Sequence, residues 1–202
     1  MKIQGHRGSK GTHPENTLSS FQEAIDAGAD GIELDLRMQK DGTIVIHHDS
    51  LQRNKGPILS LKEFFFALKD QRRVVLNLEL KETIGPNLLN LVKEFQFENR
   101  VYYSSFQLPL LKEIRNQDER AILGYIVDHT PNLQEIPDID ISILSPEESL
   151  LNRDLIMTLQ TAGYRIIPWT VNNPRRAKEL AEMGIDEIIT DYPRLFKEGN
   201  FL

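Results

Sequence analysis

The sequence contains no cysteine, one tryptophan and no long run of apolar residues. The absence of cysteine excludes a disulfide framework, a thiol nucleophile and a zinc site built on cysteine ligands. No segment approaches the roughly 18 consecutive apolar residues of a membrane-spanning helix, and the amino-terminal "MKIQGHRG" lacks the apolar core of a signal peptide. We therefore expect a soluble, cytoplasmic protein with no stable membrane insertion.

Basic residues are outnumbered by acidic ones. The chain has 24 Lys and Arg against 30 Asp and Glu, a net charge of −6, which disfavours a nucleic-acid partner or an anionic membrane surface. A small anionic substrate would therefore need a local positive site. A length of 202 residues with 40% hydrophobic residues suits one buried core, and we expect a single domain over residues 1–202. A homo-oligomer is compatible with these features.

Short apolar or β-branched segments recur between longer amphipathic stretches. Those typical of strands are "KIQG", "GIELDL", "VVLNLEL", "RVYYSSF", "AILGYIV", "IDISIL", "YRIIPW" and "IDEIIT". Helical patterns cover 17–27, 61–69 and 174–183, whereas "DHTPNLQEIPD" is too interrupted by proline for a full helix. Alternating strands and helices favour a parallel sheet with right-handed crossovers. We expect a (β/α)8 TIM barrel, with a doubly wound open sheet as the alternative.

A hairpin is expected directly after the second strand. "DG" at 41–42 lies between two β-prone segments, which is typical of a two-residue turn. Counting outward from that turn places Asp35 opposite His48. Because directly opposed residues share a face of the sheet, this register predicts that His48, rather than His47, lies beside Asp35.

Alternation along two predicted strands brings acidic side chains to one face. Glu33 and Asp35 share a face of the second strand, and Glu79 faces the barrel interior from the next strand. Three converging carboxylates repel one another unless a cation or protons compensate. Oxygen ligands without cysteine favour a hard divalent ion, Mg²⁺ or Ca²⁺. The alternative is that these acids pair with Arg37 and Lys81 in a polar core.

Two histidines flank the acidic cluster. His6 follows the first strand and His48 follows the hairpin, which suits one general acid and one general base around a central electrophile. Arg7 and Lys81 are the candidate cations for a phosphate, and the alternative for Arg7 is a salt bridge to Glu33 or Glu15. This set of residues suits attack on a phosphorus ester.

Two further residues have weaker signals. Trp169 lies at the end of the seventh predicted strand, as either a packed aromatic or one wall of a substrate pocket. Asn16 comes just before a helical pattern and is interpreted first as its N-cap.

The sequence resembles the glycerophosphodiester phosphodiesterase family over nearly its whole length. The resemblance rests on "HRG" at 6–8, "PENT" at 14–17, "ELD" at 33–35, "KDG" at 40–42, "HHD" at 47–49, "ELK" at 79–81, "WTVN" at 169–172 and "ITDYP" at 189–193. It implies a (β/α)8 barrel that hydrolyses glycerophosphodiesters to an alcohol and glycerol 3-phosphate with a divalent metal. The implied roles are acid and base for His6 and His48, metal binding for Glu33, Asp35 and Glu79, and phosphate binding for Arg7 and Lys81.

One departure from the family concerns substrate specificity. Similar members carry an insertion between the "HD" motif and the next barrel strand that covers the site and shapes its glycerol pocket. Here only 24 residues separate Asp49 from Val74, and most of them form the helix predicted at 61–69. Two alternatives therefore stand beside the glycerophosphodiesterase: a phosphodiesterase for a related substrate such as a lysophospholipid, and a non-catalytic barrel that binds a phosphate ligand.

Overall fold

The computed structural model of the chain describes residues 1–53, 56–71, 73–134, 136 and 139–198. The strands are β1 (Lys2–Gly5), β2 (Gly31–Met38), β3 (Ile44–Ile46), β4 (Val75–Leu80), β5 (Val101–Ser105), β6 (Leu123–Val127), β7 (Ile143–Pro146), β8 (Arg165–Ile166) and β9 (Glu187–Thr190). The α-helices are α1 (Leu18–Asp26), α2 (Leu61–Leu68), α3 (Asn87–Glu94), α4 (Leu108–Gln117), α5 (Arg153–Thr161), α6 (Pro174–Glu182) and α7 (Pro193–Glu198). Single 3-10 turns cover Leu51–Arg53, Glu98–Arg100 and Glu148–Leu150.

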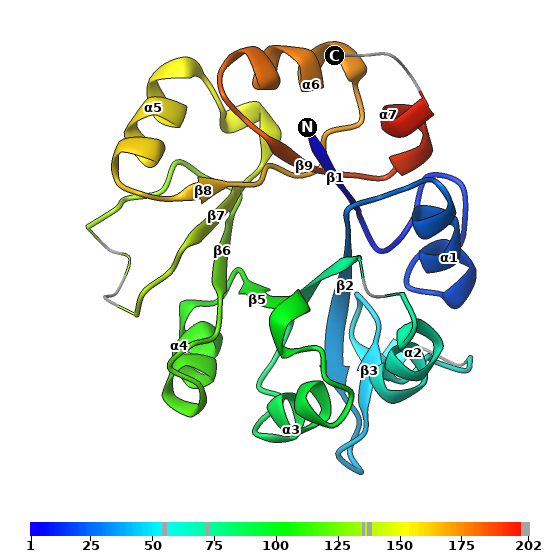
Figure 1. The fold of residues 1–202 in the computed structure, drawn as a ribbon. Coiled ribbons are helices and arrows are strands. Elements are labelled where there is room, and N and C mark those ends of the chain that lie inside the picture. Colours follow the sequence, from blue (N-terminus) through cyan, green and yellow to red (C-terminus); the bar gives the residue numbers. More distant parts are fainter. Residues whose placement is uncertain (54–55, 72, 135, 137–138, 199–202) are drawn as a thin grey trace.

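The strands belong to one sheet that curls into a barrel. Their order is β8-β7-β6-β5-β4-β2-β1-β9, with parallel pairing along this path. The two ends meet through hydrogen bonds from Ile189 N to Pro168 O (2.9 Å) and from Val171 N to Ile189 O (2.8 Å). Figure 1 shows the helices arranged around this ring of strands. The expected (β/α)8 barrel is confirmed, and the open sheet is excluded.

One crossover in the described part of the chain lacks a helix. No helix is assigned to the described residues between β6 and β7, on the left of Figure 1. Prolines in "DHTPNLQEIPD" predict this loop, because proline disrupts helix interiors. Residues 135, 137 and 138 of this stretch lie outside the described residues.

Aromatic side chains fill the layer between the barrel and the first helices. Phe21 of α1 packs edge-on against Phe64 of α2 with ring centroids 4.7 Å apart, and Phe65 stacks on Phe97 at 4.5 Å. All four rings are fully buried. Such burial contributes about 1.5–3 kcal/mol for each ring and anchors α1 and α2 beside β2 and β4. No helix in the described part of the chain is long and apolar enough to cross a membrane.

The hairpin between β2 and β3 forms, but its predicted register is wrong by one residue. Leu36 pairs with Ile46 and Arg37 pairs with Val45, which places Asp35 opposite His47 rather than His48. The loop holds three residues, because Gln39 N donates to Thr43 O (2.9 Å). Gly42 adopts φ 87°, a left-handed conformation typical of the last residue in such three-residue loops.

The predicted N-cap of α1 is also wrong. Thr17, rather than Asn16, has the extended backbone of a cap, and its side chain accepts a hydrogen bond from Ser20 N (3.2 Å). Asn16 is buried with φ 57° and points toward the barrel. Its place in the fold is therefore part of the site described next.

Candidate active site

Three carboxylates converge at the carboxyl ends of two neighbouring strands. In the parallel pair of β2 and β4, Asp35 lies opposite Glu79, and Glu33 lies opposite Asn77. One oxygen atom from each of the three acids lies within 4.8 Å of the others, and all three side chains are buried. The structure thus brings together the acids that strand alternation assigns to one face.

Two cations enter this cluster. Lys81 Nζ lies 2.8 Å from Asp35 Oδ1 and also contacts the Glu79 carboxylate. Arg7 Nε lies 3.2 Å from Asp35 Oδ2, while Arg7 Nη1 donates to both oxygens of Glu15 at 3.0 Å. Lys81 therefore forms the ion pairs expected of a polar barrel core, and Arg7 forms the salt bridge to Glu15 that was its alternative.

Arg37 takes no part in the acidic cluster described above. Its Nη1 donates to Glu82 Oε2 (3.1 Å), and its Nε and Nη2 both donate to the carbonyl oxygen of His48 (3.0 and 2.7 Å). The alternative in which Arg37 neutralises the acids is therefore wrong. Arg37 instead fixes the backbone that carries His48.

The acids differ in how strongly the protein favours their ionised forms. Burial, together with the charges of Asp35 and Glu79, raises the pKa of Glu33 well above its ordinary value. Burial also raises the pKa of Glu79 to about 7, against the opposing effect of Lys81. Burial disfavours ionised Asp35 too, but Lys81 and Arg7 outweigh it and lower the pKa of Asp35. Without a further cation, Glu33 and Glu79 therefore hold their protons more tightly than free carboxyl groups do.

The donor set fits a hard divalent ion. Glu33 Oε2 accepts a hydrogen bond from Arg7 N (2.8 Å), but Glu33 Oε1 is buried without a hydrogen-bond partner. Unsatisfied buried carboxylate oxygen is energetically costly, and a cation removes that cost. Because the three acids offer oxygen ligands only, Mg²⁺ and Ca²⁺ both suit this site.

A sharp turn after β1 places His6 and Arg7 over the barrel. Arg7 has φ 50° and Gly8 has φ 86°. A Cβ atom at Gly8 would lie 2.5 Å from Ser20 Oγ, so the turn requires glycine for both backbone conformation and space. Ser20 Oγ in turn donates to Arg7 O (2.9 Å), which ties the turn to α1.

His6 and His48 line the same pocket in different surroundings. His6 Nε2 lies 4.0 Å from Glu33 Oε2, and His6 Nδ1 lies 2.6 Å from Asp191 Oδ1. Burial lowers the pKa of His6 despite the hydrogen bond to Asp191. His48 Nδ1 lies 2.8 Å from Asp49 Oδ1, and its side chain is 37% exposed against 13% for His6. His48 lies two residues after Ile46, the last paired residue of β3, and it reaches the pocket although the predicted register is wrong.

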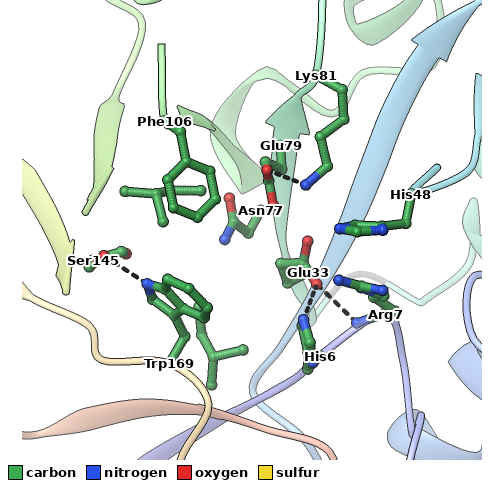
Figure 2. A pocket seen from close by; sticks show the side chains of 12 residues that line it. His6, Arg7, Glu33, His48, Asn77, Glu79, Lys81, Phe106, Ser145 and Trp169 are labelled. Carbon is green, nitrogen blue, oxygen red and sulfur yellow. Dashed lines mark hydrogen bonds and ion pairs between the residues drawn. The ribbon is translucent and has the colours of Figure 1, made fainter. Parts of the chain in front are cut away.

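A cavity of about 170 Å³ connects these groups. Its polar side is lined by His6, Arg7, Glu33, His48, Glu79 and Lys81, and its remaining wall by Asn77, Phe106, Ile126, Ser145, Trp169 and Ile189. Trp169 Nε1 donates to Ser145 O (2.9 Å), and the indole packs edge-on against Phe106 at 5.4 Å. Figure 2 shows Trp169 across the pocket from His6, Glu33 and Lys81. Trp169 is therefore both a packed aromatic and a pocket wall.

Sequence reasoning missed several polar contributors. Asn16 Nδ2 donates to Asp35 Oδ2 (2.7 Å), and Asp191 binds His6 while accepting a hydrogen bond from Asn172 Nδ2 (2.6 Å). Asp191 directly follows β9, at the barrel end where active sites of this fold are built. The position of Asp191 within "ITDYP", directly after the last predicted strand, is the sequence feature that indicates a place in the site.

The chain matches a protein-family model over most of its length. The model of the Glycerophosphoryl diester phosphodiesterase family matches residues 6–56 and 67–195. The chain belongs to this family. The break at 57–66 falls within the stretch where the sequence predicts a shortened family insertion.

Relatives in the family match along nearly their whole length. A glycerophosphodiester phosphodiesterase of Bacillus altitudinis is 33% identical over 233 aligned positions, covering 95% of both chains. The aligned length exceeds the 202 residues of this chain, so the relative carries residues without a counterpart here.

Solved structures of the family share the barrel. An Oleispira antarctica phosphodiesterase in complex with the product sn-glycerol-3-phosphate has 25% identity and a TM-score of 0.88, covering 98% of this chain and 96% of that one. A glycerophosphodiester phosphodiesterase of Thermotoga maritima has 28% identity and a TM-score of 0.81, covering 97% and 96%.

Proposed function

We propose that the protein hydrolyses glycerophosphodiesters to an alcohol and glycerol 3-phosphate, with a divalent metal and with acid–base catalysis by two histidines. The observation that carries this proposal is the convergence of His6, His48 and three buried carboxylates on one cavity. The product complex of the Oleispira antarctica relative supports the substrate class. The substrate is a small molecule, and a cytoplasmic location remains a prediction from the sequence.

Glu33, Asp35 and Glu79 would hold the metal. Mg²⁺ or Ca²⁺ bound there would supply Lewis-acid stabilisation of negative charge on the phosphoryl oxygens. Asn16, Arg7 and Lys81 keep Asp35 ionised and oriented toward the cluster. These contacts prepare the carboxylates before substrate enters, which lowers the reorganisation needed during reaction.

The remaining pocket residues would bind substrate and move protons. Arg7 and Lys81 supply positive charge for the phosphate, and Trp169 bounds the organic part of the substrate. His6 and His48 carry the two proton transfers that hydrolysis requires, one to the leaving oxygen and one from the attacking group. Their placement on separate elements, after β1 and after β3, allows them to serve two different atoms of the substrate.

A lysophospholipid is the second candidate substrate. The short segment between Asp49 and Val74 leaves fewer residues to cover the pocket than a family insertion provides. A relative called Lysophospholipase D in Rattus norvegicus is 24% identical and covers 96% of this chain. A larger group on the substrate would extend from an uncovered pocket into solvent.

The test is product release from defined substrates. Glycerophosphocholine, glycerophosphoethanolamine and lysophosphatidylcholine are each assayed with Mg²⁺, with Ca²⁺ and with EDTA. Metal-dependent release of glycerol 3-phosphate from the first two supports the proposal. Turnover of lysophosphatidylcholine alone favours the second candidate. Tight phosphate binding without turnover under every condition would favour a binding protein.

Variants of the two histidines test the catalytic assignment. His6→Ala and His48→Ala are each expected to lower kcat by about 10²-fold or more, the usual effect of losing a proton-transfer group. His129→Ala is the matched control, since His129 is exposed and pairs with Asp128 in a loop. Wild-type kcat in either pocket variant would contradict its assignment.

A further inference from the structure

Asp191 links one pocket histidine to the closing strand of the barrel. Its Oδ1 lies 2.6 Å from His6 Nδ1, and its Oδ2 accepts a hydrogen bond from Asn172 Nδ2 (2.6 Å). Both carboxylate oxygens are thus engaged by side chains that face the pocket end of the barrel. The hydrogen bonds from His6 and Asn172 outweigh burial and lower the pKa of Asp191, so it is ionised at neutral pH.

An ionised carboxylate at this position determines which ring nitrogen of His6 holds the proton. It has no proton to donate, so the 2.6 Å contact requires hydrogen on His6 Nδ1. In the neutral ring, Nε2 then carries the lone pair. Nε2 is the nitrogen 4.0 Å from Glu33 Oε2, on the pocket side of the ring (Figure 2).

We propose that Asp191 is a positioning residue that holds His6 in its Nδ1–H tautomer, with Nε2 directed into the pocket to accept a proton. This inference rests on the catalytic role proposed for His6. It also distinguishes the two histidines, because it gives His6 the base function when the ring is neutral.

The backbone around Asp191 is tied down on both sides. β1 and β9 are parallel neighbours with Gly5 opposite Thr190, so His6 and Asp191 directly follow a matched pair of residues. His6 N donates to Thr190 O (2.8 Å), and Gly11 N donates to Asp191 O (2.9 Å). The distance between imidazole and carboxylate is therefore set by the sheet rather than by a loop.

Asn172 completes the support for the carboxylate. Its Oδ1 accepts hydrogen bonds from Asp191 N (2.9 Å) and Thr190 Oγ1 (3.1 Å), while its Nδ2 donates to Asp191 Oδ2. These bonds orient the amide so that its donor faces the carboxylate. His48 lacks comparable support, because its partner Asp49 is adjacent in sequence and 77% exposed.

Asp191→Asn tests the inference with little change in shape. The asparagine amide can donate to Nδ1, which moves the proton of neutral His6 to Nε2 and removes the acceptor from the pocket. We expect kcat to fall by about 10²-fold or more, with KM within about threefold of wild type. Asp128→Asn is the matched control, because Asp128 contacts the exposed loop residue His129 (2.9 Å) outside the pocket, and it is expected to change kcat by less than about threefold.

The tautomer of His6 and the catalytic activity are measured in separate experiments. Nitrogen-15 NMR of the metal-loaded wild-type protein, with His6 assigned through His6→Ala, is expected to show protonated Nδ1 and unprotonated Nε2 at a pH where the ring is neutral. Asp191→Asn is expected to reverse this pattern, and His6→Ala/Asp191→Asn should lose no more activity than His6→Ala. Asn172→Ala, with a smaller loss of kcat of about 3- to 10-fold, extends the test if Asp191→Asn folds poorly.

Three results would overturn the inference. If His6 of the wild-type protein carries its proton on Nε2, the inference is wrong, and no variant is needed to show it. Unchanged kcat in folded Asp191→Asn, with a large loss in His6→Ala, refutes the positioning role and leaves the proposed function intact. Wild-type activity in His6→Ala refutes both the inference and the acid–base assignment.

Discussion

Each end of the barrel buries a glutamate, but the two carboxylates differ in their hydrogen-bond partners and in the charges around them. At the amino-terminal end, Glu187 of β9 accepts a hydrogen bond from Gln4 Nε2 (2.7 Å) and contacts Arg165. At the carboxyl end, Glu33 of β2 faces two other acids and keeps one oxygen without a hydrogen-bond partner. A satisfied carboxylate contributes to folding, whereas an unsatisfied one beside like charges marks a place where a cation binds.

The side chains around Glu187 and around Glu33 support the same distinction. Gln4 Oε1 accepts a hydrogen bond from Tyr102 Oη (3.0 Å), which extends the network around Glu187 into the barrel centre. Around Glu33, burial together with the charges of Asp35 and Glu79 raises the pKa of the carboxyl. We therefore expect substitutions at the two ends to separate activity from stability.

The largest expected effect is on catalysis at the carboxyl end. Glu33→Gln removes a proposed metal ligand and is expected to lower kcat/KM by about 10³-fold, consistent with several kcal/mol of metal stabilisation. The melting temperature without metal should stay close to that of the wild-type protein, because the neutral amide resembles the protonated carboxyl that burial and the charges of Asp35 and Glu79 favour at Glu33. Steady-state kinetics and thermal denaturation in EDTA measure both quantities. A large fall in melting temperature would show that Glu33 supports the fold.

The opposite result is expected at the amino-terminal end. Glu187→Gln weakens charge-assisted contacts to Gln4 and Arg165 and is expected to lower the free energy of unfolding by about 1–3 kcal/mol. Because Arg165 is partly exposed, water limits the loss. Urea denaturation measures this change, and kcat per folded molecule should stay within about twofold of wild type. A loss of kcat with an unchanged free energy of unfolding would contradict the expected separation of stability and activity between the two ends.

The metal is expected to stabilise the protein more at high pH than at low pH. The pKa of Glu79 is raised from 4.5 to about 7, so the metal-free folded state holds an extra proton on Glu79 between these values. Stability from Glu79 is therefore present below about pH 4.5 and lost as pH rises through about 7, and the raised pKa of Glu33 acts in the same direction. A metal replaces those protons and restores stability.

Thermal denaturation with and without Mg²⁺ or Ca²⁺ at pH 5 and pH 8 checks this dependence. The rise in melting temperature caused by the metal should be larger at pH 8. Glu33→Gln/Glu79→Gln is the control and should show little rise at either pH. Equal rises in the wild-type protein at both pH values would contradict the proposed ligands.

The smallest effect is expected at Trp169, which lines the uncharged side of the pocket. Trp169→Leu removes the indole and its hydrogen bond to Ser145 O, and it reduces the apolar surface facing the substrate. We expect KM to rise about 3- to 10-fold with kcat within about threefold, since the role proposed for the indole is to contact the organic part of the substrate rather than a reacting atom. Phe106→Leu is the companion variant, because Phe106 packs edge-on against the indole and lines the same pocket. A large loss of kcat in Trp169→Leu would place the indole beside the reacting atoms.

Local patterns in the sequence were enough to predict the barrel and the face of each acid. Alternation in "GIELDL" and "VVLNLEL" places Glu33, Asp35 and Glu79 inward, because successive strand residues point to opposite faces. The length of the hairpin loop after β2 was harder to predict. The Asp41-Gly42 pair fits both two- and three-residue hairpin loops, and the choice between them shifted the register by one residue.

The contacts around His6 depended on the closed barrel. His6 and Asp191 are 185 positions apart and meet because β9 pairs with β1. Asn16 reaches Asp35 because the turn after β1 folds back over β2. The fold class and the inward-facing residues follow from local periodicity, so they can be predicted from the sequence. The contacts among the inward residues depend on strand register and ring closure, because these join segments that are distant in the chain.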